Sequence, residues 1–380
     1  MLFTLLLLVT LFWIFIAIDT YRGIRELPKL EPEPPTASCG LVSIIVPARN
    51  EAHTIEKSIR SQLQQTYKPI EWILVNDRST DGTGEIMENL AKSDSRIHVQ
   101  HVSSLPKGWL GKNYALHKGA ELSAGNLLVF TDADILYEPD LIAKAAAYFT
   151  RNSLDHLTIS PNLQARSFML KGFISFFLFG FSYYKRPWNA NRDHKKGGMG
   201  IGAFNMISRT SYQKMDGHQS IRMRPDDDLQ LGILVKKHGF KQRMVTAITM
   251  LKVEWYPTVA EAVKGLEKNT FAGLHYSYLL VAGAAAGVFI SQFLPFITLF
   301  HSEAAIRLIS AAAICALAVV YLPLTRRLTS YSSWHVILFP LSVCLFIFAI
   351  CRASFLTLKR GGIQWRGTTY SLKEMKKQMK

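Results

Sequence analysis

Cysteine is scarce in this sequence, and the few cysteines are not arranged to bind a metal. Four occur in 380 residues, and none has the spacing of a metal-ligand pair: Cys39, Cys315, Cys344 and Cys351. Three of them lie within apolar runs. This pattern argues against a metal site built from thiolates and favours a reduced protein on the cytoplasmic side.

The sequence also lacks nucleic-acid modules, internal repeats and low-complexity tracts, and acidic residues are in the minority. The formal net charge of +16 is compatible with a nucleic-acid partner, yet base-reading and base-stacking motifs are absent. The basic residues instead flank apolar segments. We therefore expect anionic lipid, and not nucleic acid, to be their counterpart.

Long apolar runs are what the sequence has in abundance. Hydrophobic residues make up 49% of the chain and gather in four uncharged stretches, at residues 1–18, 269–302, 308–325 and 328–351. A helix of roughly 20 apolar residues crosses the hydrocarbon core of a bilayer. The distribution predicts a multi-pass protein of the cell membrane.

The first apolar run is interpreted as a retained anchor over residues 1–20. It has no basic start and no small-residue cleavage site, whereas the alternative, a cleaved signal peptide, requires both. Arg22, Arg25 and Lys29 follow it and place the globular part of the chain in the cytoplasm. Three later crossings would put the C-terminus outside, but the tail from Lys359 to Lys380 is basic, so one run would have to be re-entrant or interfacial. The sequence leaves this open.

Composition divides the rest of the chain. Residues 21–38 form a Pro-rich linker, residues 39–266 a globular domain, residues 274–354 the C-terminal membrane helices, and residues 355–380 a basic tail. Within the globular part, residues 167–184 are aromatic and almost uncharged. They predict a helix lying in the membrane interface, with a buried core helix as the alternative.

Strand-like and helix-like segments alternate in the first half of the globular domain. Strands are expected at 41–46, 70–75, 97–102 and 126–131, with helical patterns between them, as at 81–92 and 112–122. Such alternation predicts an α/β class with a doubly wound, mostly parallel sheet.

Carboxylates follow two of these strands. Asp77 ends the second strand, and Asp132 and Asp134 come two residues apart after the fourth, so that both would face one side at the ligand-binding edge of the sheet. Oxygen ligands on a cation that also takes phosphate oxygens suit Mg²⁺ or Mn²⁺ better than zinc. The expected ligand is a diphosphate.

Two further segments lie where a nucleotide would bind. Residues 46–51, Val-Pro-Ala-Arg-Asn-Glu, occupy the turn from the first strand to a helix. Residues 108–113, Gly-Trp-Leu-Gly-Lys-Asn, precede another helix, where Lys112 can neutralise a diphosphate. Their glycine spacing is not that of a P-loop. Asp81, before Gly82, is interpreted as a helix cap.

Taken in order, these motifs resemble the nucleotide-binding half of family 2 glycosyltransferases of the GT-A fold. The resemblance implies a membrane-bound GT-A domain in which Pro47, Ala48, Arg49 and Glu51 line the nucleotide pocket. It further implies that Asp77 bonds the base and that Asp132 and Asp134 hold the ribose and the metal, while Lys112 contacts the diphosphate.

A third acidic cluster, Asp226-Asp227-Asp228, opens a helix that ends in Lys236-Lys237. Acids first and bases last suit the helix dipole, which alone would explain them. Three adjacent carboxylates also repel one another, which raises the proton affinity of at least one and makes it a candidate base. By resemblance to the family, Asp227 is the expected base, with Asp226 beside it and Asp228 as the nearest competitor.

The end of the chain departs from many membrane-bound relatives. The Gln-x-x-Arg-Trp segment of processive enzymes is missing between Trp255 and His275. The segment from Gly361 to Tyr370 instead resembles the ending of bacterial carotenoid (4,4'-diaponeurosporenoate-type), hopanoid-associated and ceramide glycosyltransferases. That resemblance implies that Trp365 and Arg366 contact the substrate, the alternative being a solvated basic tail.

The sequence thus predicts an inverting, metal-dependent enzyme that moves a hexose from a nucleotide-diphosphate sugar, such as a UDP-sugar, to a lipid or isoprenoid acceptor. Two alternatives remain: a processive polysaccharide synthase, and a membrane protein that binds a nucleotide sugar without catalysis.

Overall fold

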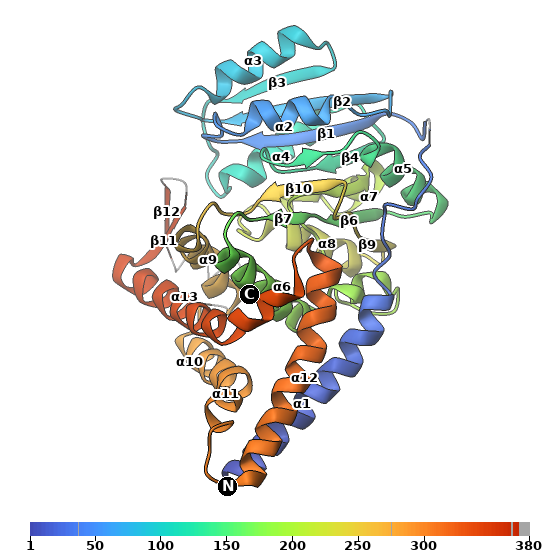
Figure 1. Ribbon diagram of the computed structural model, residues 1–380. Helices are drawn as coiled ribbons and strands as arrows, with labels where there is room; N and C mark the ends of the chain where they lie inside the picture. Colours follow the sequence, from blue (N-terminus) through green and yellow to red (C-terminus); the bar gives the residue numbers. More distant parts are fainter. Residues whose placement is uncertain (37, 275, 366–367, 372–380) are drawn as a thin grey trace. The chain divides into compact units, whose positions relative to one another are not determined.

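The computed structural model describes residues 1–36, 38–274, 276–365 and 368–371 (Figure 1). The chain divides into two compact units, each assembled from separate stretches of sequence. The sheet unit comprises Glu26–Gln164 and Pro187–Glu254. The apolar unit comprises Met1–Arg25, Ala165–Arg186 and Trp255–Lys380.

A seven-stranded sheet organises the sheet unit. Its strand order is β3-β2-β1-β4-β8-β6-β9, and every neighbouring pair is parallel except the two that include β8. The strands are β1 (Val42–Ala48), β2 (Ile70–Asp77), β3 (Ile97–Val102), β4 (Leu127–Phe130), β6 (His156–Ser160), β8 (Asn205–Ser208) and β9 (Gln242–Thr246). The predicted α/β class with a mostly parallel, doubly wound sheet is confirmed.

Strand β1 shows why this sheet is covered on both faces. All seven of its residues are buried, as expected for a central strand with a continuous apolar sequence. Ile44 packs into one core cluster with Ile59 of α2 (Ile55–Gln62), and Ile45 packs into the other with Leu116 of α4 (Gly111–Leu122). Alternate side chains of one strand therefore seed two cores on opposite faces.

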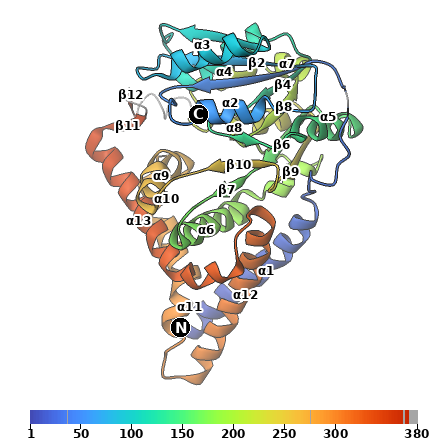
Figure 2. The ribbon, with the colours of Figure 1, turned by 45° about the horizontal axis from the view of Figure 1, so that its top comes forward.

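The remaining helices of this unit connect the strands. They are α3 (Thr83–Ser93), α5 (Leu141–Arg151), α7 (Arg209–Lys214) and α8 (Asp227–Lys237), with short 3₁₀ turns η1 (Pro187–Asn191) and η2 (Gly217–Gln219). A small second sheet is formed by β5 (Leu136–Tyr137), β10 (Leu251–Glu254) and β7 (Asn162–Gln164), and Figure 2 shows β7 and β10 running side by side.

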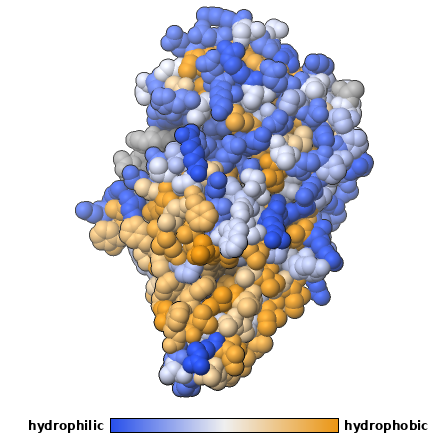
Figure 3. Space-filling view, in the orientation of Figure 1, coloured by the Kyte–Doolittle hydropathy of each residue, from blue (hydrophilic) through white to orange (hydrophobic). Residues whose placement is uncertain are grey.

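The apolar unit is helical. It contains α1 (Leu2–Arg25), α6 (Phe168–Lys185), α9 (Val259–Gly273), α10 (Tyr278–Val288), the π-helical turn η3 (Phe289–Phe293), α11 (Leu294–Thr298), α12 (Ala304–Leu328), the 3₁₀ turn η4 (Ser333–Leu338) and α13 (Phe339–Arg360), followed by the hairpin β11 (Gly362–Trp365) and β12 (Thr368–Ser371). Four segments are long and apolar enough to cross a membrane: Leu2–Arg25, Tyr278–Thr298, Ala304–Leu328 and Ser333–Arg360. Figure 3 shows hydrophobic residues spread over much of the surface of this unit.

Helix α1 is packed into the apolar unit along α12. The ring of Trp13 stacks on Phe179 of α6 with centroids 5.4 Å apart, and its indole N–H donates to the carbonyl of Ser291, 2.8 Å away. The π-helical turn lengthens the hydrogen-bond ladder locally, which frees backbone groups for such contacts. Helix α1 thus contributes to the fold of this unit.

Helix α6 has a buried face and an exposed one. Phe173, Phe176 and Phe179 are buried, and Phe176 and Phe179 pack edge-on against Phe339 of α13. Phe168 and Tyr184, at its two ends, are about half exposed. The helix therefore forms part of a packed helical unit, and whether its outer face lies in a membrane interface stays a prediction.

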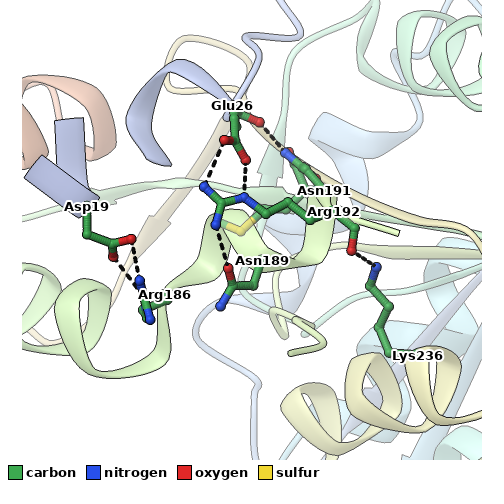
Figure 4. A network of polar contacts seen from close by, with 8 residues as sticks. Asp19, Glu26, Arg186, Asn189, Asn191, Arg192 and Lys236 are labelled. Atoms are coloured by element: carbon green, nitrogen blue, oxygen red, sulfur yellow. Dashed lines mark hydrogen bonds and ion pairs between the residues drawn. The ribbon is translucent and has the colours of Figure 1, made fainter. Parts of the chain in front are cut away.

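Two ion pairs mark the point where α1 ends (Figure 4). Within the apolar unit, Arg186 donates to both carboxylate oxygens of Asp19, with its Nε 2.8 Å from Oδ2. Within the sheet unit, Arg192 binds Glu26 through two hydrogen bonds of 2.6 and 2.8 Å, and Lys236 donates to the Arg192 carbonyl at 2.9 Å. Charged side chains thus form ion pairs shortly before and just after the end of α1.

Candidate active site

The carboxyl ends of β1, β2 and β4 share one edge of the sheet because these strands run parallel. Pro47 and Ala48 are the last residues of β1 and pair in register with Val75 and Asn76 of β2. Strand β4 pairs with β1 only as far as Ile45. Pro47 therefore lies beyond the end of the β1–β4 hydrogen-bond ladder. Proline is accommodated there because it has no N–H to donate to such a ladder.

Asp132 and Asp134 lie in the turn after β4, which ends at Phe130. The expectation that they alternate along a strand is therefore wrong. A pair of contacts holds this turn: the Asp132 N–H donates to the Gly202 carbonyl at 3.0 Å, and the Thr131 hydroxyl donates to the Ala203 carbonyl at 2.8 Å. The segment that leads into β8, with Gly202 and Ala203, therefore holds this turn in place.

Carboxylates crowd at this edge. Burial, followed by the charges of Asp132 and Glu51, raises the pKa of Asp134 to about 7. A bound cation would relieve this repulsion. Within the described residues, no group of three or more His, Cys, Asp or Glu side chains is arranged as a metal cluster. Two carboxylates nevertheless fit Mg²⁺ or Mn²⁺, because these ions keep waters and take phosphate oxygens as further ligands.

Lys112 lies among the acids. It is the second residue of α4, and its Nζ is 2.7 Å from Asp132 Oδ1 and 3.2 Å from Asp227 Oδ2. Burial by itself would lower the pKa of Lys112, but the charges of Asp132, Asp227 and Asp228 outweigh it and the pKa is raised. The ammonium group is therefore held in its charged form by these acids.

The structure separates the three adjacent acids. Asp226 accepts two hydrogen bonds from Arg224, at 3.0 and 3.1 Å, and one from Gln230 at 2.7 Å. Asp227 is buried and faces Lys112. Asp228 accepts the Gly202 N–H at 2.7 Å, and burial together with the Asp227 charge raises its pKa to about 6. Each carboxylate thus has a different partner.

Gly202 is a site residue that the sequence analysis did not identify. A Cβ at this position would lie 2.5 Å from Asp132 Oδ2 and 3.4 Å from Asp228 Oδ2. Only glycine lets these two carboxylates converge at that backbone. The run from Gly197 to Gly202 contained the signal, since four of its six residues, just before β8, are glycine.

The expected base-binding residue, Asp77, is the last residue of β2 and is buried. Arg78 donates from Nε to Asp77 Oδ1 at 2.7 Å, and Arg49 Nη1 lies 3.9 Å from Oδ2. A Cβ on Gly111 would lie 2.2 Å from Asp77 Oδ2. The second glycine of the Gly-Trp-Leu-Gly-Lys segment thus gives the Asp77 carboxylate the space it occupies.

Two loops at this edge are tied to each other. Asn50, which has a φ of 56°, accepts the Thr80 N–H at 2.8 Å, and Asp81 accepts the N–H groups of Ala52 at 3.2 Å and Thr83 at 3.0 Å. Burial opposes ionisation of Asp81, but the bonds from Thr83 and Ala52 lower its pKa. Asp81 therefore supports the start of α3, as the sequence suggested, and also braces the loop that carries Glu51.

The structure brings most of the expected residues into one unit. The residues at positions 47–51, 77, 112, 132, 134 and 226–228 all belong to the sheet unit. Trp365 is the last residue of β11 in the apolar unit, and Arg366 lies outside the described residues. The expected role of these last two stays a prediction.

Comparison with known proteins agrees with this architecture. Residues 43–215 match the model of the family described as Glycosyl transferase family 2. The match covers a little under half of the chain and identifies this region as family 2 glycosyltransferase sequence. The matched region contains the nucleotide-side motifs, from the end of β1 to the acids after β4, and stops before the Asp226–Asp228 cluster.

The relatives of this chain fall into two kinds. An uncharacterized glycosyltransferase of Haemophilus influenzae is 38% identical over 121 residues, which is 32% of this chain and 36% of that protein. The match to the putative teichuronic acid biosynthesis glycosyltransferase TuaG of Bacillus subtilis, 34% identical, covers 30% of this chain and 43% of the relative. The chain therefore matches only about two fifths of such relatives. The 4,4'-diaponeurosporenoate glycosyltransferase of Staphylococcus aureus is 23% identical, over 87% of this chain and 88% of that protein.

Among solved structures, the mannosyltransferase PcManGT from Pyrobaculum calidifontis resembles the chain with a TM-score of 0.52 and 17% identity, over 94% of this chain and 98% of that one. That protein was solved in complex with GDP-Man and Mn²⁺. The likeness confirms the predicted GT-A-like fold with its mixed, mostly parallel sheet.

Proposed function

We propose that the protein is an inverting, metal-dependent hexosyltransferase that takes a hexose from a UDP-sugar and transfers it to a hydroxyl or carboxylate on an isoprenoid or similar lipid. The observation that carries this proposal is the convergence of Asp132, Asp134, Asp228 and Lys112 at the carboxyl edge of the sheet. A lipid acceptor is supported by the four long apolar helices and by the similarity to the diaponeurosporenoate enzyme along most of the chain.

The donor side follows from the charges. Asp77, held between two arginines, offers acceptor oxygens to the N–H of a base. Mg²⁺ or Mn²⁺, held by Asp132 and Asp134, would neutralise charge on the diphosphate as it leaves. Lys112, at the start of α4, supplies a second positive charge to the same leaving group, and the helix N-terminus favours an anion there.

The acceptor side needs a base when the acceptor is a hydroxyl. Asp227 forms an ion pair with Lys112, which leaves its Oδ2 less open to an acceptor hydroxyl. Asp228 has a pKa of about 6, near the value at which a carboxylate can accept a proton and still be ionised at neutral pH. We therefore propose Asp228 as the base, in place of the Asp227 expected from the family alignment, with Asp227 positioning Lys112.

Two alternative functions make different products. A processive synthase would extend one chain many times, and a nucleotide-sugar sensor would bind without turnover. The apolar unit, with its four long apolar segments, is compatible with either, but the raised pKa of Asp228 near the charged Lys112 at one sheet edge is typical of a catalytic site. We place the catalytic domain on the cytoplasmic side, where the basic residues after α1 favour it.

The test is transfer of labelled sugar in membranes that contain the protein. Incubation with labelled UDP-glucose or UDP-GlcNAc and Mg²⁺ or Mn²⁺ should give one labelled product in the lipid extract. Asp134→Asn should lower that transfer by about 1000-fold, because the leaving diphosphate loses its stabilisation. Asp193→Asn is the matched control, since Asp193 pairs with Arg243 on the surface.

A ladder of products would replace this proposal with the polymer synthase. Donor binding that depends on Mn²⁺ but gives no product with any lipid extract would replace it with the sensor.

A further inference from the structure

The ammonium group of Lys112 lies at a position that a divalent cation bound to Asp132 would need. Its Nζ contacts Asp132 Oδ1 at 2.7 Å, a hydrogen-bonded ion pair of ordinary length. Asp132 is also one of the two acids that fit the cation. The lone pair of Asp132 Oδ1 that accepts the ammonium hydrogen cannot also bind a metal. The two positive charges therefore compete for it.

The second contact of Lys112, with Asp227, can keep its ammonium group bound when it leaves Asp132. Asp227 Oδ2 lies 3.2 Å from Nζ, and this acid is almost fully buried while Asp132 is more open, with side-chain exposures of 6% and 39%. The lysine side chain has four rotatable bonds and can shift its head group without moving α4. The arriving diphosphate brings negative charge to the same helix terminus, which gives the ammonium a new partner.

We propose that Lys112 holds Asp132 in the donor-free protein and releases it to the cation only when a nucleotide diphosphate binds. Lys112 is then a positioning residue that couples the two ligands. The inference rests on the proposed function, because it assumes a nucleotide-sugar donor and a divalent cation.

The coupling has a thermodynamic consequence that does not involve turnover. If the nucleotide moves Lys112 off Asp132, the nucleotide tightens cation binding, and the cation must tighten nucleotide binding by the same factor. The cation alone should bind weakly, because it must displace a charge that Asp132 and Asp227 already hold. Such coupling keeps a bare cation from occupying the site without a donor.

The experiment measures Mn²⁺ binding to the purified full chain in detergent, with UDP, with GDP and with neither nucleotide. In the wild type, the nucleotide that binds should tighten Mn²⁺ by about tenfold or more. Lys112→Met should tighten binding of Mn²⁺ alone by a similar factor and reduce the synergy to the part that comes from phosphate oxygens bound to the cation. Lys112→Arg, which keeps the charge, should restore weak binding of Mn²⁺ alone.

Two controls separate this mechanism from a general charge effect. Lys118→Met removes the same charge from the same helix, where Lys118 pairs with Glu121 at 2.8 Å, and should leave Mn²⁺ binding unchanged. The double variant Lys112→Met with Asp227→Asn keeps the net charge of the wild type and leaves no buried, unpaired Asp227. It should still show the gain in affinity for Mn²⁺ alone, and it provides the measurement if the single variant does not fold.

The outcomes distinguish the inference from the function beneath it. A wild type that binds UDP or GDP with Mn²⁺, combined with a double variant whose affinity for Mn²⁺ alone equals that of Lys118→Met, overturns the coupling and leaves the proposed function intact. A wild type that binds neither nucleotide at any Mn²⁺ concentration overturns both.

Discussion

The two units bury polar groups in opposite ways. In the sheet unit, buried acids such as Asp77 and Asp227 form ion pairs, with Arg78 and Lys112 respectively. In the helices of the apolar unit, buried polar groups are mostly hydroxyls that donate to a carbonyl four residues earlier, as Thr10 does to Leu6 at 2.8 Å. The same bond recurs at Ser310, Ser354 and Thr357.

This difference reflects what each unit must contact. A hydroxyl that is satisfied within its own helix needs nothing from its surroundings, which suits a helix in hydrocarbon. Carboxylates at a sheet edge need a counter-charge, which a ligand or a lysine can supply. The apolar unit also exposes large hydrophobic residues, including Leu8, Phe15, Leu279 and Phe300. Such a surface is stable only against lipid or protein.

Of the four predictions that follow, the one with the largest expected effect concerns the charged groups at the edge of the sheet. With a hydroxyl acceptor, Asp228→Asn should lower kcat at least about a hundredfold without weakening nucleotide binding, because it removes the base alone. Turnover should rise as the pH increases through about 6, since the base acts when ionised. Steady-state kinetics and nucleotide titration give both readings. A loss of kcat in Asp227→Asn but not in Asp228→Asn would show that Asp227 is the base.

The apolar side is tested by a pair of exposed leucines. Leu8 in α1 and Leu122 in α4 are 60% and 53% exposed, one in each unit. Leu8→Arg should oppose insertion of α1 by about 3 kcal/mol, whereas Leu122→Arg should cost nearly nothing in water. Insertion of the full chain into microsomes measures the difference. Equal insertion of both variants would mean that α1 does not face lipid.

A third prediction concerns the stability of the sheet unit. Burial lowers the pKa of His156 to about 4, below its ordinary value of 6.5. Between these two pH values, His156 is protonated in the unfolded chain and neutral in the folded chain. The free energy of unfolding therefore falls as the pH drops from about 6.5 to about 4. The loss is about 3 kcal/mol for this group.

Denaturant unfolding of the wild type and of His156→Gln, followed across that pH range, checks this prediction. The variant should lose less stability than the wild type as the pH falls. Parallel curves would show that His156 does not titrate on unfolding. The same window includes His218, whose pKa burial lowers to about 3, so the slope in the variant should shrink without vanishing.

The smallest expected effect concerns the fit of one glycine. Gly111→Ala places a methyl group 2.2 Å from Asp77 Oδ2 and should weaken nucleotide binding by about tenfold, because the carboxylate must move. Gly82→Ala, at a neighbouring loop with nothing within 4 Å, is the matched control. Nucleotide titration compares them. Equal nucleotide affinities of the two variants would mean that Asp77 is not part of the nucleotide pocket.

Most of the sheet was predictable because its strands are apolar and separated by helical periods. The strand expected at 97–102 matches β3, and the one expected at 70–75 lies within β2. The helix expected at 112–122 begins one residue earlier, as α4. Prediction was weaker where the chain leaves regular structure, as at Asp132 and Asp134. The turn that carries them is held by Gly202 and Ala203, which lie about 70 positions further along, just before β8.

The sequence by itself determined which residue types gather at the edge of the sheet and which segments are apolar enough to cross a membrane, because both follow from local patterns of burial and charge. Only the tertiary structure decided how the acids divide their roles. Asp226 turns to Arg224, Asp227 to Lys112 and Asp228 to Gly202, although the three are adjacent in the chain. Proton affinity depends on the distance to charges and on burial, and neither can be read from neighbours in sequence.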